Sequence, residues 1–253
     1  MDETKINFLV QKEMKRIELQ LTTAQKRWEI IEKDPRTHRK PYIPMREVIQ
    51  TVENHKYLLE QFEIPLHSAF WLQMNPSYHM QRPGTFVRLV DKEKKEIVMS
   101  DTQMEQDTCI EYVNKARGEV LVAGLGIGLT LIPVLLKPEV DSVTVIEIDP
   151  YVIDLVLPQL REWFSKDEER IYCFDKLAII SNDIMQWNSV SIYDTIFFDI
   201  WNDISLDNLE NMHCLHECFA EFIDPSGWMD SWMYQKLRKV EQSGDLFITP
   251  FEV

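Results

Sequence analysis

The sequence predicts an α/β protein built on a doubly wound, mostly parallel β-sheet. From residue 119 onward, short apolar segments alternate with longer amphipathic ones, which is the alternation of strands and helices. The strand segments are apolar on both faces, as in parallel sheets covered by helices on each side. They span residues 119–124, 142–148, 176–181, 193–200 and 227–232.

Helices are predicted between these strands at 129–136, 150–164 and 207–223. Pro150 suits the first turn of the second helix, because an N–H would have no partner there. Ahead of the sheet, residues 104–116 predict another amphipathic helix, and residues 85–99 predict a β-hairpin. We therefore expect a loop and β-hairpin over 65–103, followed by the sheet domain over 104–253.

Residues 1–64 predict a helical N-terminal extension. Apolar side chains alternate there at spacings of four and three, typical of a coiled-coil seam, at Val10, Met14, Ile17, Leu21, Ala24, Trp28 and Ile31. Prolines within 34–44 end this helix. A second seam follows at Met45, Val48, Val52, His55, Leu59 and Phe62. We expect a helical hairpin that either packs on its own subunit or mediates homo-oligomerisation.

Glycine is concentrated after the first strand of the predicted sheet. Gly124, Gly126 and Gly128 are three of the seven glycines in the chain. In a strand–turn–helix context, glycines let the backbone approach a ligand closely. Glu147 ends the next strand, where a carboxylate can accept hydrogen bonds from both hydroxyls of a ribose. Asp183 follows the third strand, where it could meet the exocyclic amine of an adenine.

A dinucleotide would use several of these features, but the glycine spacing favours another ligand. The third glycine of a dinucleotide fingerprint would stand at Leu129, and the chain contains one such half-site only. An adenosine that carries a thioether fits better, because two acids would hold its ribose and its adenine without a phosphate cradle.

The segments VLVAGLGIGLTL, VTVIEIDPYVI, NDI and YDTIFFDIW resemble the Rossmann-like class I S-adenosylmethionine-dependent methyltransferases over residues 100–235. Within that superfamily they look most like the branch that includes spermidine synthases. The resemblance implies S-adenosyl-L-methionine as the cofactor, with the three glycines along its methionine portion and Glu147 on its ribose. It also implies that Ile148 packs on the adenine and that Asp183 faces the adenine amine.

The chain departs from spermidine synthases in two places. Those enzymes carry an aspartate within the glycine turn, where this chain has Ile127. Their fourth strand ends in an aspartate followed by two serines, whereas Asp199 is followed here by Ile200 and Trp201. Asp199 therefore matches the family's catalytic acid in surroundings that differ, which favours methyl transfer over aminopropyl transfer.

Asp199, Trp201 and Asp203 are the predicted catalytic residues on the substrate side. Asp199 ends the fourth strand, and open α/β sheets bind ligands at that edge. A carboxylate there can take a proton from an amine or attract a cation, and an indole can form a wall beside that cation. The structural alternatives are a loop cap for Asp199, simple packing for Trp201 and a helix N-terminal role for Asp203.

These observations predict an S-adenosylmethionine-dependent methyltransferase that acts on a small acceptor, for which a cation is one candidate. Three alternatives stay open. They are a spermidine synthase-like aminopropyltransferase, a non-catalytic adenosylmethionine-binding module that works through its helical arm, and an NAD-linked enzyme.

Composition argues against several other classes of protein. The net charge is −15, and residues 51–253 carry 34 acidic against 16 basic residues, so we expect the main domain to repel nucleic acid. No apolar run is long enough to predict a membrane span. Four cysteines and the absence of a secretory pattern at the N-terminus predict a cytoplasmic location. The segment HCLHEC at 213–218 suggests zinc, but a helix brings too few of its side chains together, so no metal is expected.

Overall fold

The computed structural model of the protein describes residues 11–16, 18, 22, 41–66, 68, 82–187, 189 and 191–243. The chain divides into two compact units, of which one comprises Met1–Lys40 with Glu63–Gly84 and the other Pro41–Phe62 with Thr85–Val253. In the first unit, residues 11–16 are helical. Met14 belongs to the predicted N-terminal seam, and the other members of that seam lie outside the described residues.

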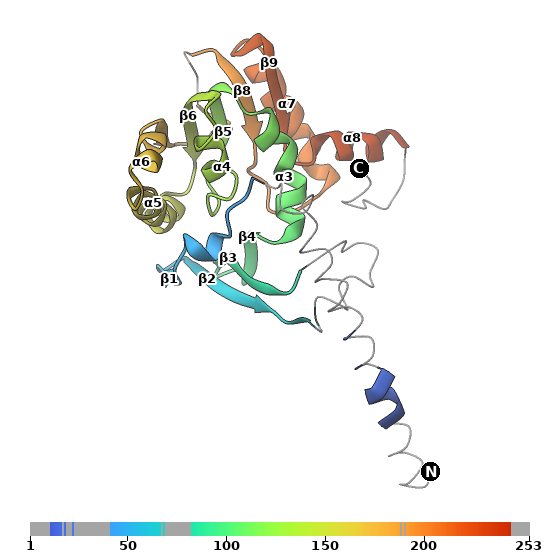
Figure 1. Cartoon of the computed structure of the whole chain (residues 1–253). Coiled ribbons are helices and arrows are strands. Elements are labelled where there is room, and N and C mark those ends of the chain that lie inside the picture. Colours follow the sequence, from blue (N-terminus) through green and yellow to red (C-terminus); the bar gives the residue numbers. More distant parts are fainter. Residues whose placement is uncertain are drawn as a thin grey trace. The chain divides into compact units, whose positions relative to one another are not determined.

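The second unit contains a five-stranded parallel sheet with the strand order β7-β6-β5-β8-β9 (Figure 1). Its strands are β5 (Gly118–Ala123), β6 (Val140–Glu147), β7 (Leu177–Ser181), β8 (Tyr193–Phe198) and β9 (Ile223–Ser231). Each coincides with a predicted strand. The order runs outward from β5 to β7 and then reverses to β8 and β9, which is a Rossmann-like, doubly wound arrangement. The predicted α/β fold class is confirmed at this level.

The described residues of this unit form six α-helices. They are α3 (Gln103–Lys115), α4 (Leu131–Leu135), α5 (Pro150–Ser165), α6 (Glu168–Phe174), α7 (Leu209–Phe219) and α8 (Tyr234–Ser243). The first three and α7 confirm predicted helices, whereas α6 and α8 were not predicted. In the described part of the chain, no helix combines the length and the apolar character needed to cross a bilayer.

Alternation along β5 divides the core into two layers. Val120 and Val122 belong to the larger apolar cluster, which includes the buried side of α5. Leu121 and Ala123 belong to the second cluster, which includes Leu215 and Phe219 of α7. Both faces of the strand are therefore buried, as the continuous apolar sequence of β5 requires.

A second sheet precedes α3 in the chain and has the strand order β1-β2-β3-β4. Strands β3 (Gly84–Asp91) and β4 (Glu96–Ser100) pair antiparallel and confirm the predicted hairpin. Strands β1 (Val52–Glu53) and β2 (Tyr57–Ile64) also pair antiparallel, with Val52 opposite Leu59. The predicted second helix of the N-terminal hairpin is therefore wrong. Its residues form a short 3₁₀ turn, η1 (Met45–Glu47), and these two strands.

Asn54 explains why a helical spacing gave a wrong prediction here. Its side-chain oxygen accepts hydrogen bonds from the backbone N–H groups of Lys56, at 2.9 Å, and Tyr57, at 2.8 Å. An asparagine that bonds the backbone two and three residues on forms a turn in place of a helix. Tyr57 and Leu59 are then buried on one face of β2, which is the period of a strand.

Candidate functional site

A cavity of about 610 Å³ lies at the carboxyl edge of the parallel sheet. Such a volume suits a small organic ligand. The residue that ends or follows each of the five strands lines this cavity: Gly124, Glu147, Asn182, Asp199 and Trp232. Ligands of open α/β sheets bind at this edge, where the strand order reverses. Here the reversal falls between β5 and β8, so the crevice opens between Gly124 and Asp199.

The glycine turn divides between the cavity and the core. Gly124 and Gly126 line the cavity and have positive φ angles of 97° and 50°. A Cβ atom at Gly124 would overlap the carbonyl oxygen of Asp199, and one at Gly126 would overlap the sulfur of Met99. Gly128 has a φ of 80° but does not line the cavity, and a Cβ there would lie 2.9 Å from Leu160 of α5. Gly128 serves helix packing in this structure.

Glu147 is buried in the wall of the cavity with both carboxylate oxygens positioned. One oxygen accepts the N–H of Leu125 at 2.8 Å, and the other accepts the N–H of Asp149 at 2.8 Å. Burial raises the pKa of Glu147, and these backbone bonds partly oppose that effect. A carboxylate oxygen has two lone pairs, so each keeps capacity for a hydroxyl group of a ligand.

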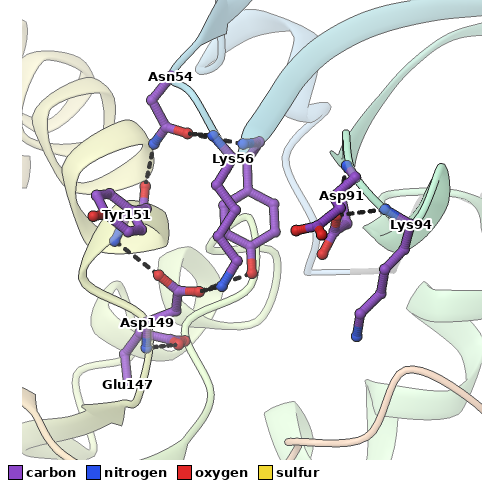
Figure 2. Close-up of polar contacts among 9 residues, drawn as sticks. Asn54, Lys56, Asp91, Lys94, Glu147, Asp149 and Tyr151 are labelled. Carbon is purple, nitrogen blue, oxygen red and sulfur yellow. Dashed lines mark hydrogen bonds and ion pairs between the residues drawn. The ribbon is translucent and has the colours of Figure 1, made fainter.

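The neighbouring Asp149 ties the small sheet to the cavity (Figure 2). It accepts hydrogen bonds from the ammonium of Lys56, from the hydroxyl of Tyr57 at 2.8 Å and from the N–H of Tyr151 at 3.0 Å. Burial alone would raise the pKa of Asp149, but the bonds from Lys56 and Tyr57 bring it below its usual value. The same bond raises the pKa of Lys56, so this ammonium is held in its charged form.

Lys56 and Tyr57 are therefore wall residues that sequence reasoning missed. The small sheet also contributes Leu89, Val98 and Met99 to the cavity. No sequence pattern pointed to these side chains, because their place depends on how β2, β3 and β4 pack over the strand ends.

The residues predicted to hold adenine lie at the β7 side of the cavity. Ile148 and Asp183 both line it. Ile148 is 65% exposed, so its side chain is available to a flat ring. Asp183 also closes a turn, because its carboxylate accepts the N–H of Met185 and the side-chain amide of Gln186, both at 2.9 Å.

The predicted substrate-side residues separate into two groups. Asp199 and Trp201 line the cavity. Asp203 does not: it is exposed, and its carbonyl and carboxylate oxygens accept the side-chain amide of Asn208 at 2.9 Å and 3.4 Å. This arrangement stabilises the loop ahead of α7, so the structure gives Asp203 a capping contact and no position in the cavity.

Glu105 of α3 is a cavity residue that the sequence could have indicated. It lies four residues before Cys109 and seven before Tyr112, both fully buried, so all three share the inner face of the helix. A carboxylate on a buried helical face needs an explanation, because charged groups are rarely placed there without a partner.

The HCLHEC segment lies on α7, away from this cavity. The Cys214 and Cys218 sulfurs are 4.0 Å apart on exposed positions, and His216 contacts the hydroxyl of Ser231 at 2.9 Å. Among the described residues, no three His, Cys, Asp or Glu side chains are grouped so that they could hold a metal ion.

The fold and the cavity together define an α/β protein with a ligand pocket at the switch point of a doubly wound sheet. No protein-family model matches the sequence, and no curated protein matches it significantly. Solved structures with a similar fold include the N-methyltransferase NodS from Bradyrhizobium japonicum WM9, at 15% identity and a TM-score of 0.39 over 51% of this chain and 67% of that one.

Two further solved structures have similarly low sequence identity and TM-scores. A DhpI–SAH complex shares 16% identity at a TM-score of 0.36, over 49% of this chain and 54% of that one. The glycopeptide N-methyltransferase MtfA shares 18% identity at a TM-score of 0.32, over 44% of each chain. The match thus covers 44–67% of the length of these three proteins, and likenesses this remote carry no argument about the activity of this chain.

Proposed function

We propose that this protein is an S-adenosyl-L-methionine-dependent methyltransferase that acts on a small cationic acceptor. One observation carries the proposal: Gly124 and Gly126 of the glycine turn and the doubly hydrogen-bonded Glu147 line the same cavity as Asp199 and Trp201. In the proposed complex, Glu147 binds the ribose, Ile148 and Asp183 face the adenine, and Gly124 and Gly126 allow the methionine portion to lie against the backbone.

The sulfonium of the cofactor would then point toward Asp199. Methyl transfer needs little covalent assistance from the protein, and alignment of the acceptor with the methyl carbon supplies most of the acceleration. Asp199 is placed to take a proton from the acceptor. Trp201 offers an aromatic face to a cationic group.

Aminopropyl transfer is a second candidate, favoured by one specific observation. The glycine turn lacks the acid found in spermidine synthases, but Glu105 supplies a carboxylate to the same cavity from α3. This candidate requires decarboxylated S-adenosylmethionine in place of S-adenosylmethionine, so ligand preference distinguishes the two.

The test is titration calorimetry with S-adenosylmethionine, its decarboxylated form, S-adenosylhomocysteine and NAD. We expect S-adenosylmethionine and S-adenosylhomocysteine to bind and NAD not to bind. Glu147→Ala removes charged hydrogen bonds to the ribose, worth roughly 1.5–3 kcal/mol each, so affinity should fall at least about tenfold.

Glu162→Ala is the matched control, because the Glu162 side chain is 71% exposed on α5. It should leave affinity unchanged. Glu147→Gln, which preserves the side-chain shape, separates lost ligand contacts from misfolding, and circular dichroism should show both Glu147 variants folded. Unchanged S-adenosylmethionine affinity in folded Glu147→Ala, or tighter binding of NAD, would contradict the proposal.

A further inference from the structure

The cavity contains two carboxyl groups that reach it from different elements. Asp199 follows β8, and Glu105 lies in the first turn of α3. Within the described residues, no side chain donates a hydrogen bond to either carboxylate, and neither forms an ion pair. Glu105 has a hydrogen bond from the backbone of Ser100, and burial alone accounts for the pKa shift of Asp199. Carboxylates of low exposure normally have charged or side-chain partners, so two without one in a ligand cavity indicate that the ligand completes the site.

Among the described residues, the charge that acts on the pKa of Glu105 is that of the acid Asp199, and no cation offsets it. Glu105 and Asp199 are close enough for the charge of Asp199 to raise the pKa of Glu105. Burial raises the pKa of Cys109 and Tyr112 of α3 and of Tyr42, and the charge of Asp199 raises each of them further. The hydroxyl groups of Tyr42 and Tyr112 are buried without a hydrogen-bond partner.

The cations of the cavity lie elsewhere in it. Among the described residues, Lys56 and Lys94 are the basic side chains that line the cavity. Lys56 is bound to Asp149, and Lys94 belongs to the β3–β4 turn beside Asp91 (Figure 2). Neither lysine contributes to the pKa of Glu105. The two lysines therefore lie at the small-sheet end of the cavity, where the acids Asp91, Glu93 and Asp149 also line it, and not at the end formed by α3 and β8.

The two carboxyl groups at this end of the cavity can change their protonation state near neutral pH. Burial raises the pKa of Asp199 to about 7, and burial together with the charge of Asp199 raises the pKa of Glu105 to about 8. The two groups titrate as a pair, so the empty site holds at least part of a proton near pH 7.5. A bound cation would favour the charged form of both carboxyls and expel that proton.

We propose that Glu105 and Asp199 together bind the ammonium group of an amine acceptor, with Trp201 and Trp232 as the aromatic walls beside it. This inference rests on the proposed function, because an amine is an acceptor only if the protein transfers a group to it. One carboxylate then takes the proton that the amine must lose: an N–H bond breaks, an O–H bond forms, and the electron pair stays on nitrogen. Glu105 is thereby a second substrate-binding acid, contributed from outside the parallel sheet.

The test measures amine binding and proton release together. Butylamine, phenethylamine and 1,4-diaminobutane are titrated at pH 7.5 into the protein saturated with S-adenosylhomocysteine, in phosphate and in HEPES buffer, neither of which contains a primary amine. The difference in heat between buffers gives the number of protons released, for which we expect about 0.5–1 per amine bound. The alcohol 2-phenylethanol has a similar shape without the charge and should release none.

Glu105→Gln should weaken amine binding about tenfold or more and reduce the proton release, since one titrating carboxyl is lost. Glu111→Gln is the matched control, because Glu111 is exposed on the same helix. Circular dichroism and an unchanged affinity for S-adenosylhomocysteine show that Glu105→Gln is folded.

Three results of the amine titrations would overturn the inference. They are absence of binding by all three amines, amine binding without proton release, and unchanged amine binding in Glu105→Gln. A loss of S-adenosylhomocysteine affinity in folded Glu105→Gln would also overturn it, because the pair would then hold the ammonium of the cofactor. Failure of the proposed function is separate, since it is seen as absent S-adenosylhomocysteine binding before any amine is added.

Discussion

Replacing Asp199 by asparagine should stabilise the protein in neutral and alkaline solution while lowering its activity. The change removes a charge and preserves the shape of the side chain. Burial raises the pKa of Asp199 from 3.8 to about 7. Residues that bind ligands often lower the folding stability of a protein, and a buried carboxylate such as Asp199 is of this kind.

The size and pH dependence of the effect follow from this pKa. Below pH 4 the carboxyl of Asp199 is protonated in both the folded and the unfolded chain, so its ionisation does not change the free energy of unfolding. Between pH 4 and 7 the unfolded chain releases a proton that the folded protein retains, so stability falls as pH rises. Above pH 7 the loss of stability is constant. A pKa raised from 3.8 to about 7 corresponds to a loss of at most roughly 4 kcal/mol in the free energy of unfolding.

The asparagine side chain cannot ionise, so the advantage of the Asp199→Asn variant over the wild type should grow from near zero at pH 4 to about 2–4 kcal/mol at pH 8. Urea denaturation at pH 4.5, 6 and 8 measures it. Asp141→Asn is the control, because Asp141 is exposed and should show no such growth. A constant difference between wild type and Asp199→Asn across this range would refute the reasoning. In methyl-transfer assays, the variant should retain cofactor affinity and lose turnover.

Two other predictions concern the walls of the cavity. Gly128→Ala should lower the melting temperature without changing S-adenosylhomocysteine affinity, because Gly128 has a φ of 80° and lies outside the cavity. Gly126→Ala should weaken S-adenosylhomocysteine binding, because its new methyl group would displace Met99 in the cavity wall. Equal effects of the two variants on binding would show that both glycines contact the ligand. Lys56→Met should raise the pKa of Asp149, measured by carbon NMR of the carboxylate, because its ammonium donor is lost; an unchanged pKa would mean that the bond is absent in solution.

The parallel sheet was predictable because its signals are local. An apolar run such as GEVLVA of β5 has no amphipathic period, and a sequence of this kind is stable only as a strand buried on both faces. Pro150 at the first position of α5 and Asp149 at its N-cap are likewise local chemistry, since the carboxylate accepts the N–H of Tyr151 two residues on. The glycine turn and Glu147 follow directly from such strands.

The region before α3 was less predictable because its periodicity was ambiguous. Apolar residues at Met45, Val52 and Leu59 fit a helical seam, yet Asn54 turns the chain between them and they enter η1, β1 and β2. A short apolar spacing can match both helix and strand, and one side-chain hydrogen bond decides between them.

By itself, the sequence determined where the strands of the parallel sheet lie and where the glycine turn follows the first of them. Both depend on residues that are a few positions apart in the chain. The tertiary structure alone decided which side chains meet in the cavity. It placed Glu105 beside Asp199 and Lys56 on Asp149, and it left Gly128 and Asp203 outside. The physical reason is that five strand ends, one helix and a second sheet converge there. Which residues face the space depends on how these elements pack, and no local pattern records that.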